Sequence, residues 1–175
     1  MIWPFKKKSV NEKHVLSIYN AIVAQSRQVP FYRDMKVPDS VTGRFDMISL
    51  HMCLVLRQLR SDDKNVKQFT QDLFDLFFKD MDSSLREIGV SDVAVPKKIQ
   101  KMGSLFYGLL GKLTNALDDE DEAALIEILN NNIYDGSSQE NALTMAKYVN
   151  KTVSYLKEQK QEDIMLGQIS FGENL

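Results

Sequence analysis

The sequence predicts an all-α fold, a single-domain bundle of about six helices around a largely buried central helix near residues 44–60. Three observations support this prediction. Apolar residues recur at three- and four-residue spacing in successive long segments, no segment alternates apolar and polar residues as a strand does, and the four prolines and eight glycines mostly lie between those segments. With 175 residues, 43% of them hydrophobic, the chain is long enough to bury one sizeable core.

The first two predicted helices differ in how much of their surface is apolar. Residues 11–28 carry one apolar face, which is typical of a helix on the outside of a bundle. An irregular connector is expected over 29–43, because Pro30 and Pro38 each push the preceding residue out of the helical region. Residues 44–60 are apolar nearly all round, which indicates a helix packed on several sides.

Three further helices are predicted in the middle of the chain. The first covers residues 65–88 and is followed by Gly89, a residue that commonly ends a helix. The second begins at Pro96 and continues to about residue 116. The acidic run 118–122 is expected to open the third, which reaches about Ile133, because acidic side chains suit the positive end of the helix dipole.

The end of the chain is expected to be a polar tail. A last long helix over about 139–160 repeats apolar residues at near-heptad spacing. The stretch KEQKQED (157–163) is expected to fray into a polar tail, and the apolar residues of IMLGQISFGENL, which ends the sequence, have no assigned role. We therefore divide the chain into an apolar and basic N-terminal segment (1–10), a helical domain (11–160) and a C-terminal tail (161–175).

The composition argues against several classes of function. A formal net charge of −2 gives no reason to expect a nucleic acid partner, so DNA binding is not predicted. His14 and His51 are far apart and no Cys-x-x-Cys or Glu-x-x-His spacing occurs, so neither a metal site nor a cofactor is predicted. We interpret His51 as a core histidine bonded to a neighbour, with a haem ligand as the alternative. The Ser83–Ser84 pair has no base at a recognisable spacing, so the protein is predicted not to be an enzyme.

The N-terminal stretch MIWPFKKK is a candidate membrane contact. It places Trp3 and Phe5 beside Lys6, Lys7 and Lys8. Bulky apolar residues next to a basic cluster suit a weak anchor on anionic lipid. The alternative is that Trp3 packs onto the bundle and the lysines are simply solvated.

A second candidate surface lies on the predicted helix that follows Pro96. Three lysines crowd its start, where positive charge is mildly disfavoured, so we interpret them as contacts for an anionic partner. Small residues at steps of four and three then share one face, which allows another helix to approach closely. The alternatives are a solvated face for the lysines and internal packing for the small residues. The candidate binding residues are Lys97, Lys98, Lys101, Ser104, Phe106, Tyr107, Gly108 and Gly111.

Three motifs, in order and correctly spaced, strongly resemble the ubiquinol–cytochrome c chaperone family over about residues 30–115. The first is Gly-Arg-Phe followed by a Leu-rich helix that ends in Arg, the second is FFKDMDSSLREIGV, and the third is the Lys-Lys…Met…Phe-Tyr-Gly segment. The family often continues Tyr-Gly with an arginine, where this chain has Leu109. The motif positions are Gly43, Arg44, Phe45, His51, Arg57, Phe74, Asp80, Asp82, Arg86, Gly89, Lys98, Phe106, Tyr107 and Gly108.

The resemblance implies a helical assembly factor of the cytochrome bc complex. Mitochondrial relatives are understood to bind newly made cytochrome b as it leaves the ribosome and to protect it until haem and partner subunits join. We therefore expect a non-enzymatic chaperone whose client is cytochrome b or another membrane protein. The ribosome exit region and an anionic membrane surface are further expected partners.

Since no targeting presequence is recognisable, we expect a bacterial-type member that is cytoplasmic or peripheral on the cytoplasmic face of the inner membrane. Two other functions remain as alternatives. One is a peripheral membrane- or ribosome-docking adaptor, and the other is an enzyme that acts on lipid or quinone.

Overall fold

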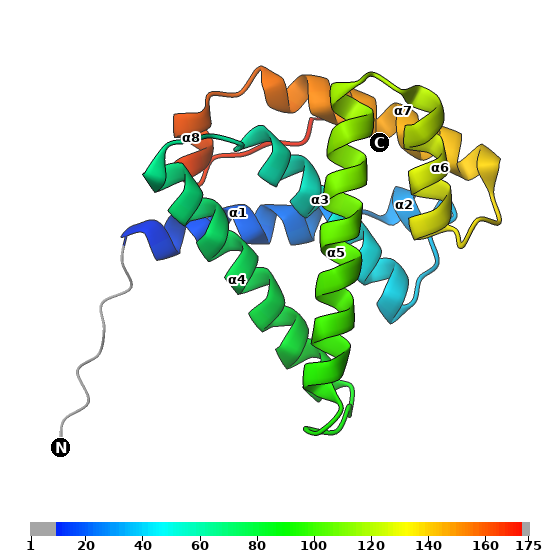
Figure 1. Ribbon diagram of the computed structural model, residues 1–175, viewed down its shortest axis with the longest axis horizontal. Coiled ribbons are helices and arrows are strands. Elements are labelled where there is room, and N and C mark those ends of the chain that lie inside the picture. Colours follow the sequence, from blue (N-terminus) through cyan, green and yellow to red (C-terminus); the bar gives the residue numbers. More distant parts are fainter. Residues whose placement is uncertain (1–9, 173–175) are drawn as a thin grey trace.

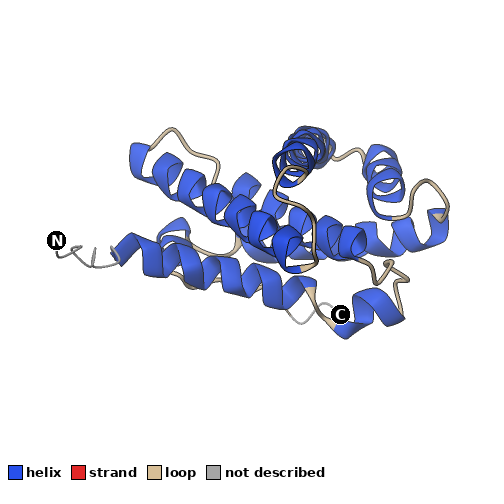
Figure 2. Cartoon of the chain, turned by 90° about the horizontal axis from the view of Figure 1, so that it is seen from below, coloured by secondary structure: helices blue, strands red, loops and turns tan. Residues whose placement is uncertain are grey.

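The computed structural model describes residues 10–172, and over that range the chain consists of helices and loops only (Figure 2). The predicted all-α fold is confirmed. Two helices of five residues each, which the periodicity did not predict, join the six long ones: α2 (Val29–Arg33) and α8 (Gln161–Met165). The long helices are α1 (Val10–Ser26), α3 (Val41–Gln58), α4 (Lys64–Glu87), α5 (Val95–Asp118), α6 (Glu122–Ile133) and α7 (Gln139–Lys157).

The central helix of the bundle is α3 (Figure 1). Eleven of its residues are buried, and it contacts α1, α5, α6 and α7. Leu50 and Met52 have no exposed surface. A helix that is apolar nearly all round is stable in water only when other helices cover it on several sides. The prediction of a largely buried central helix near residues 44–60 is therefore confirmed.

The start of α3 has a steric reason for its glycine. The hydroxyl of Ser40 caps the helix by accepting a hydrogen bond from the Gly43 backbone N–H, at 3.1 Å. A β-carbon on Gly43 would lie 1.9 Å from the carbonyl oxygen of Pro38. Only glycine fits where the connector and the helix come this close, which explains the glycine of the Gly-Arg-Phe motif.

Helices α4 and α5 form a V whose narrow end points away from α7 and α8 (Figure 1). Gly89 has a φ of 88° and ends α4, because its N–H donates to Arg86 O at 3.0 Å and the next N–H, of Val90, donates to Leu85 O at 3.0 Å. This is the Schellman arrangement, which favours glycine. The predicted helix stop at Gly89 is confirmed.

The predicted helix that follows the acidic run is present, but it begins later in the run than expected. Helix α5 continues through Asp118, because buried Leu113 and Ala116 keep its apolar face in the core. Helix α6 begins only at Glu122, and its cap is Asp121, whose carboxylate accepts a hydrogen bond from Ala124 N at 2.9 Å. The expectation is thus wrong for Asp118, which belongs to α5.

The expected fraying over 157–163 is wrong where α8 begins at Gln161, and residues 161–172 fold back onto the bundle. Ile164 of α8 has no exposed surface and Phe171 is 4% exposed. The Ser17 hydroxyl donates to Gly167 O at 2.8 Å, which fastens the segment to α1. We therefore propose that the helical domain extends to Gly172. The membrane-contact candidates Trp3, Phe5, Lys6, Lys7 and Lys8 lie outside the described residues.

Candidate functional site

An open, mostly apolar cleft of about 340 Å³ lies between α4 and α5, over the C-terminal end of α3. Leu59, the residue that follows α3, is 1% exposed and lines the cleft. The half-buried side chains of Leu56 and Leu110 lie beside it. The described helices include none that is both long and apolar enough to cross a membrane. The cleft thus presents apolar side chains at the surface of the bundle.

Two aromatic side chains in contact with each other form one wall of the cleft. Phe74 of α4 and Tyr107 of α5 have ring centroids 5.3 Å apart, and Tyr107 is 58% exposed. Phe106, the neighbour of Tyr107, points the other way and is 1% exposed, packed against Phe77 at 5.4 Å. The prediction that Phe106 binds a partner at the surface is wrong, because successive residues on a helix point about 100° apart and Phe106 faces the core.

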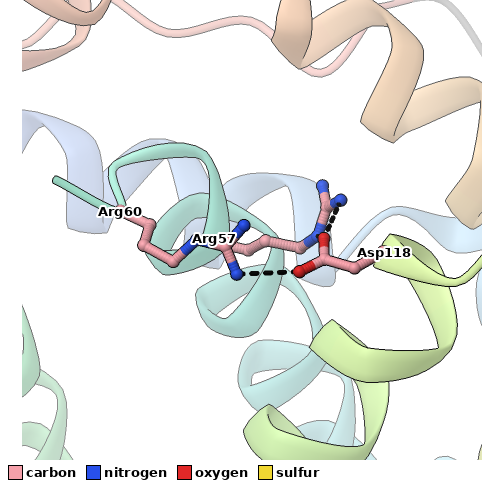
Figure 3. Close-up of polar contacts among 3 residues, drawn as sticks. All are labelled: Arg57, Arg60 and Asp118. Carbon is pink, nitrogen blue, oxygen red and sulfur yellow. Dashed lines mark hydrogen bonds and ion pairs between the residues drawn. The ribbon is translucent and has the colours of Figure 1, made fainter.

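The cleft ends in a cluster of two arginines and one carboxylate (Figure 3). Arg57 Nη2 lies 2.6 Å from Asp118 Oδ1, and Arg60 Nη1 lies 2.8 Å from Asp118 Oδ2. The hydrogen bonds that Asp118 accepts lower its pKa below the ordinary value, with the larger effect from Arg60 and the smaller from Arg57. The Arg57 side chain is 11% exposed and that of Arg60 is 64% exposed. Two guanidinium groups share one carboxylate, so this cluster by itself has a formal charge of +1, and the acidic residues 119–122 follow Asp118 in the chain.

The remaining candidate residues of α5 lie on its open surface. A β-carbon added at Gly108 or Gly111 would meet nothing within 4 Å outside its own helix. The alternative of internal packing is therefore wrong for these two glycines. Lys97, Lys98, Lys101 and Ser104 are exposed as well. None of these six residues lines the cleft, so among the eight candidates only Tyr107 does, and their role in binding stays a prediction.

Most of the family-motif positions have a structural role. Phe45 stacks on Phe77 with centroids 5.9 Å apart in the core. Asp80 accepts a hydrogen bond of 2.7 Å from the Tyr19 hydroxyl, and burial together with this bond raises the pKa of Tyr19. Asp82 forms an intrahelical ion pair with Arg86 at 2.7 Å, as its spacing predicts. Phe74 and Arg57 differ from these residues because they line the cleft.

His51 is a core histidine, as predicted. It has no exposed surface, and its Nε2 lies 2.7 Å from the Tyr148 hydroxyl while its Nδ1 lies 2.8 Å from Met47 O and 3.1 Å from Ser26 Oγ. Burial lowers the pKa of His51 to about 4, so the ring is neutral near pH 7. Both ring nitrogens have protein partners, which leaves neither directed at a ligand. Among the described residues no three His, Cys, Asp or Glu side chains converge as a metal site would require.

Asp118, which pairs with the two arginines at the end of the cleft, is a residue that the sequence did not identify. It was assigned to the start of the next helix, and its two partners lie 58 and 61 residues away in the chain. A charge in a helix sequence carries no information about a partner at that distance. Arg57 and Arg60, by contrast, are recognisable in the sequence as the charged end of an otherwise apolar helix.

Comparison with known proteins agrees with this architecture. The family described as ubiquinol-cytochrome C chaperone matches residues 33–171. The crystal structure of the Cbp3 homolog from Brucella abortus has a TM-score of 0.86 and 37% sequence identity, over 94% of this chain and 92% of that chain. Ubiquinol-cytochrome-c reductase complex assembly factor 1 of Xenopus laevis is 21% identical over 155 residues, which are 86% of this chain and 76% of that protein. The match thus extends beyond residue 115 and includes α6, α7 and α8.

Proposed function

The chain belongs to the ubiquinol–cytochrome c chaperone family, whose members are assembly factors of the cytochrome bc complex, and we propose that it holds newly made cytochrome b in the α4–α5 cleft. The observation that supports this most directly is the family match over residues 33–171 together with the 0.86 TM-score to the Cbp3 homolog. The cleft supplies the physical means, since it is apolar, open and bordered by aromatic side chains.

The size of the cleft sets what it holds. A volume of about 340 Å³ accommodates a few apolar side chains but not a whole membrane-spanning helix. A helix of the client that lays two or three apolar side chains into the cleft would use the helix-in-groove mode of recognition. The half-buried Phe74 and the exposed Tyr107, whose rings contact each other, would together cover one side of those side chains.

The charged end of the cleft would set the direction in which the client lies. Arg60 keeps a largely exposed guanidinium group at the rim while Arg57 is mostly buried against Asp118. An acidic side chain or the C-terminal end of a client helix would accept hydrogen bonds from the exposed guanidinium group of Arg60. Apolar side chains in the cleft would supply affinity and the rim charge would supply orientation.

The open face of α5 extends the proposed contact. Lys97, Lys98 and Lys101 lie in its first turns, and the glycine face with Gly108 and Gly111 leaves room for a second helix. The protein in this proposal binds and releases its client and carries out no chemical step, so it needs no cofactor. It would act at the ribosome exit region and on the cytoplasmic face of the inner membrane, where the client is made and inserted.

A matched pair of substitutions on α5 tests the cleft. Tyr107 and Leu105 are exposed to a similar degree, 58% and 53%, but only Tyr107 lines the cleft. In a strain without the native gene, Tyr107→Ala is expected to reduce the b-type haem signal in reduced-minus-oxidised membrane spectra, whereas Leu105→Ala is expected to restore it as fully as the wild type does. Both proteins should unfold at the wild-type temperature, because neither side chain belongs to the core.

Two results would contradict the proposal at different levels. Normal cytochrome b in the deletion strain would mean that the chain does not serve this client. If the deletion strain loses cytochrome b but Tyr107→Ala and Leu105→Ala restore it equally, cytochrome b remains the proposed client and the cleft is not its binding site. Crosslinking from a photoreactive residue at position 107 to nascent cytochrome b, with position 105 as the control, distinguishes direct contact from an indirect effect.

A further inference from the structure

A second hollow lies where the end of α1, the short helix α2 and the start of α3 meet. Its volume is about 600 Å³, and its lining includes three arginines, Arg27, Arg33 and Arg44, and one carboxylate, that of Asp39. It also includes Val29, which is 61% exposed. Three guanidinium groups around one depression form a distinct cationic surface in a chain whose net charge is −2. The α4–α5 cleft shares no lining residue with this hollow.

The arginines are only partly neutralised by carboxylates. Arg33 donates from Nε and Nη2 to the neighbouring Asp34 at 2.8 and 2.7 Å, and Arg44 donates from Nε to Asp39 at 2.9 Å. Arg27 has no ion pair within the part of the chain that the structure describes. Each guanidinium group carries five N–H donors, so most donors that border the hollow are available to an oxyanion.

The backbone that carries these arginines is held in place. The Tyr32 hydroxyl donates to Ser26 O at 2.8 Å, which fixes α2 against the end of α1. Phe31 has no exposed surface and anchors α2 in the core, where its ring meets that of Tyr148 at 4.9 Å. The positions of the arginines therefore depend on packed helices, so an anion that binds there does not first have to order a loop.

We propose that this hollow binds the phosphate of an anionic phospholipid headgroup and docks the chaperone on a membrane surface. Guanidinium groups match phosphate oxygens in bidentate geometry. A volume of about 600 Å³ is much larger than a free phosphate ion and suits a whole headgroup. Val29 at the rim offers an apolar side chain to the interface beside the arginines. The inference adds a location to the proposed function, on which it rests, because a chaperone for a membrane protein works beside the bilayer.

The test measures binding of the full-length protein to vesicles of phosphatidylcholine alone and of phosphatidylcholine with phosphatidylglycerol. Binding is expected only with phosphatidylglycerol and is expected to weaken as salt is added. Arg27→Ala should lower the partition coefficient about fivefold, the usual effect of one basic residue at an anionic surface. Lys147→Ala removes the same charge from an exposed position of α7 that does not line the hollow, and it should have little effect.

Further variants separate the geometry of the hollow from its charge. Arg27→Lys keeps the positive charge but loses the planar guanidinium group that can donate two parallel hydrogen bonds. This variant should therefore bind anionic vesicles less well than wild type and better than Arg27→Ala. Combining Arg27→Ala with Arg44→Ala should reduce binding further. Thermal unfolding of each variant checks that the fold is intact, which is expected because Arg27 and Arg44 are exposed.

Each contrary result has a definite meaning. Equal binding to neutral and anionic vesicles would overturn the proposal, as would anionic binding that Arg27→Ala and Lys147→Ala reduce equally. If inorganic phosphate, at a concentration equal to that of the lipid, displaces the protein from the vesicles, the hollow binds phosphate in general and is not specific for a lipid headgroup. Binding to ribosomal RNA with the same arginine dependence, and none to vesicles, would assign the hollow to nucleic acid. Capture of cytochrome b in detergent is expected to be unaffected by Arg27→Ala, so loss of the docking function and loss of the chaperone function are measured independently.

Discussion

Replacing Phe171 with alanine is expected to destabilise the protein and to expose His51 to water. The Phe171 ring is 4% exposed and contacts the His51 ring edge-on at 5.4 Å. Truncating a buried phenylalanine costs about 3–5 kcal/mol in well-packed cores. The lower end applies here, because the segment retains Ile164 and two hydrogen bonds between the Gln159 side chain and Ser170. For a domain of this size, about 3 kcal/mol corresponds to a fall in Tm of about 6–12 °C.

The histidine provides a second measurement of the same event. The folded-state pKa of His51, about 4, lies below its ordinary value of 6.5, so between these values the unfolded chain binds more protons than the folded one. The stability that this group contributes is therefore present above about pH 6.5 and is lost as the pH falls toward 4. Water admitted by Phe171→Ala should raise the pKa of His51 toward 6.5 and reduce this loss.

The assays are urea unfolding and an NMR titration of the histidine ring protons, which is simple because the chain contains two histidines. Leu166→Ala is the control, since Leu166 belongs to the same segment and is 55% exposed. It should change the free energy of unfolding by less than about 0.5 kcal/mol. If Phe171→Ala is as stable as this control and His51 still titrates near pH 4, then Phe171 does not keep water away from His51 and the prediction is refuted.

Three other substitutions test separate parts of the fold. Burial, and to a lesser degree the charge of Asp135, raise the pKa of Asp46 to about 7. Asp46→Asn should therefore stabilise the protein by about 2–4 kcal/mol at pH 8 and by little below pH 4. An equal effect on the free energy of unfolding at both pH values, measured with urea, would contradict this. Gly43→Ala should cost about 1–3 kcal/mol because its β-carbon meets Pro38 O, and an unchanged Tm would show that the connector yields. Gly108→Ala should raise stability by about 0.5–1 kcal/mol, and a loss would mean that this face is not open.

The long helices were predictable because each buries a continuous apolar face, and periodicity records burial directly. The two short helices were not, since five residues give less than two turns of pattern. In the C-terminal segment, Ile164 and Phe171 were the available signal, as large apolar residues in a polar stretch, but nothing in the sequence shows which surface they cover. That surface includes His51, more than 100 residues earlier in the chain.

The candidate site was predictable only in part, for a related reason. Phe106 and Tyr107 are adjacent on a helix with apolar residues on several sides, and the sequence does not determine which of them faces the core. The answer depends on Phe74 and Phe77 of α4, which surround Phe106 and leave Tyr107 at the mouth of the cleft. A cleft formed by three helices is a property of their packing, and no single segment contains it.

The distribution of the motif residues determines how mutants of this protein have to be interpreted. Gly43, Phe45 and His51 support the fold, so replacing any of them lowers the amount of folded protein and with it any activity in assembly. Loss of cytochrome b in such a variant therefore says nothing about client contact. Phe74 is ambiguous, because it both lines the cleft and packs on Phe106. Tyr107 is exposed, lines the cleft and has little part in the core, so a defect at this position with an unchanged Tm is evidence for a binding role.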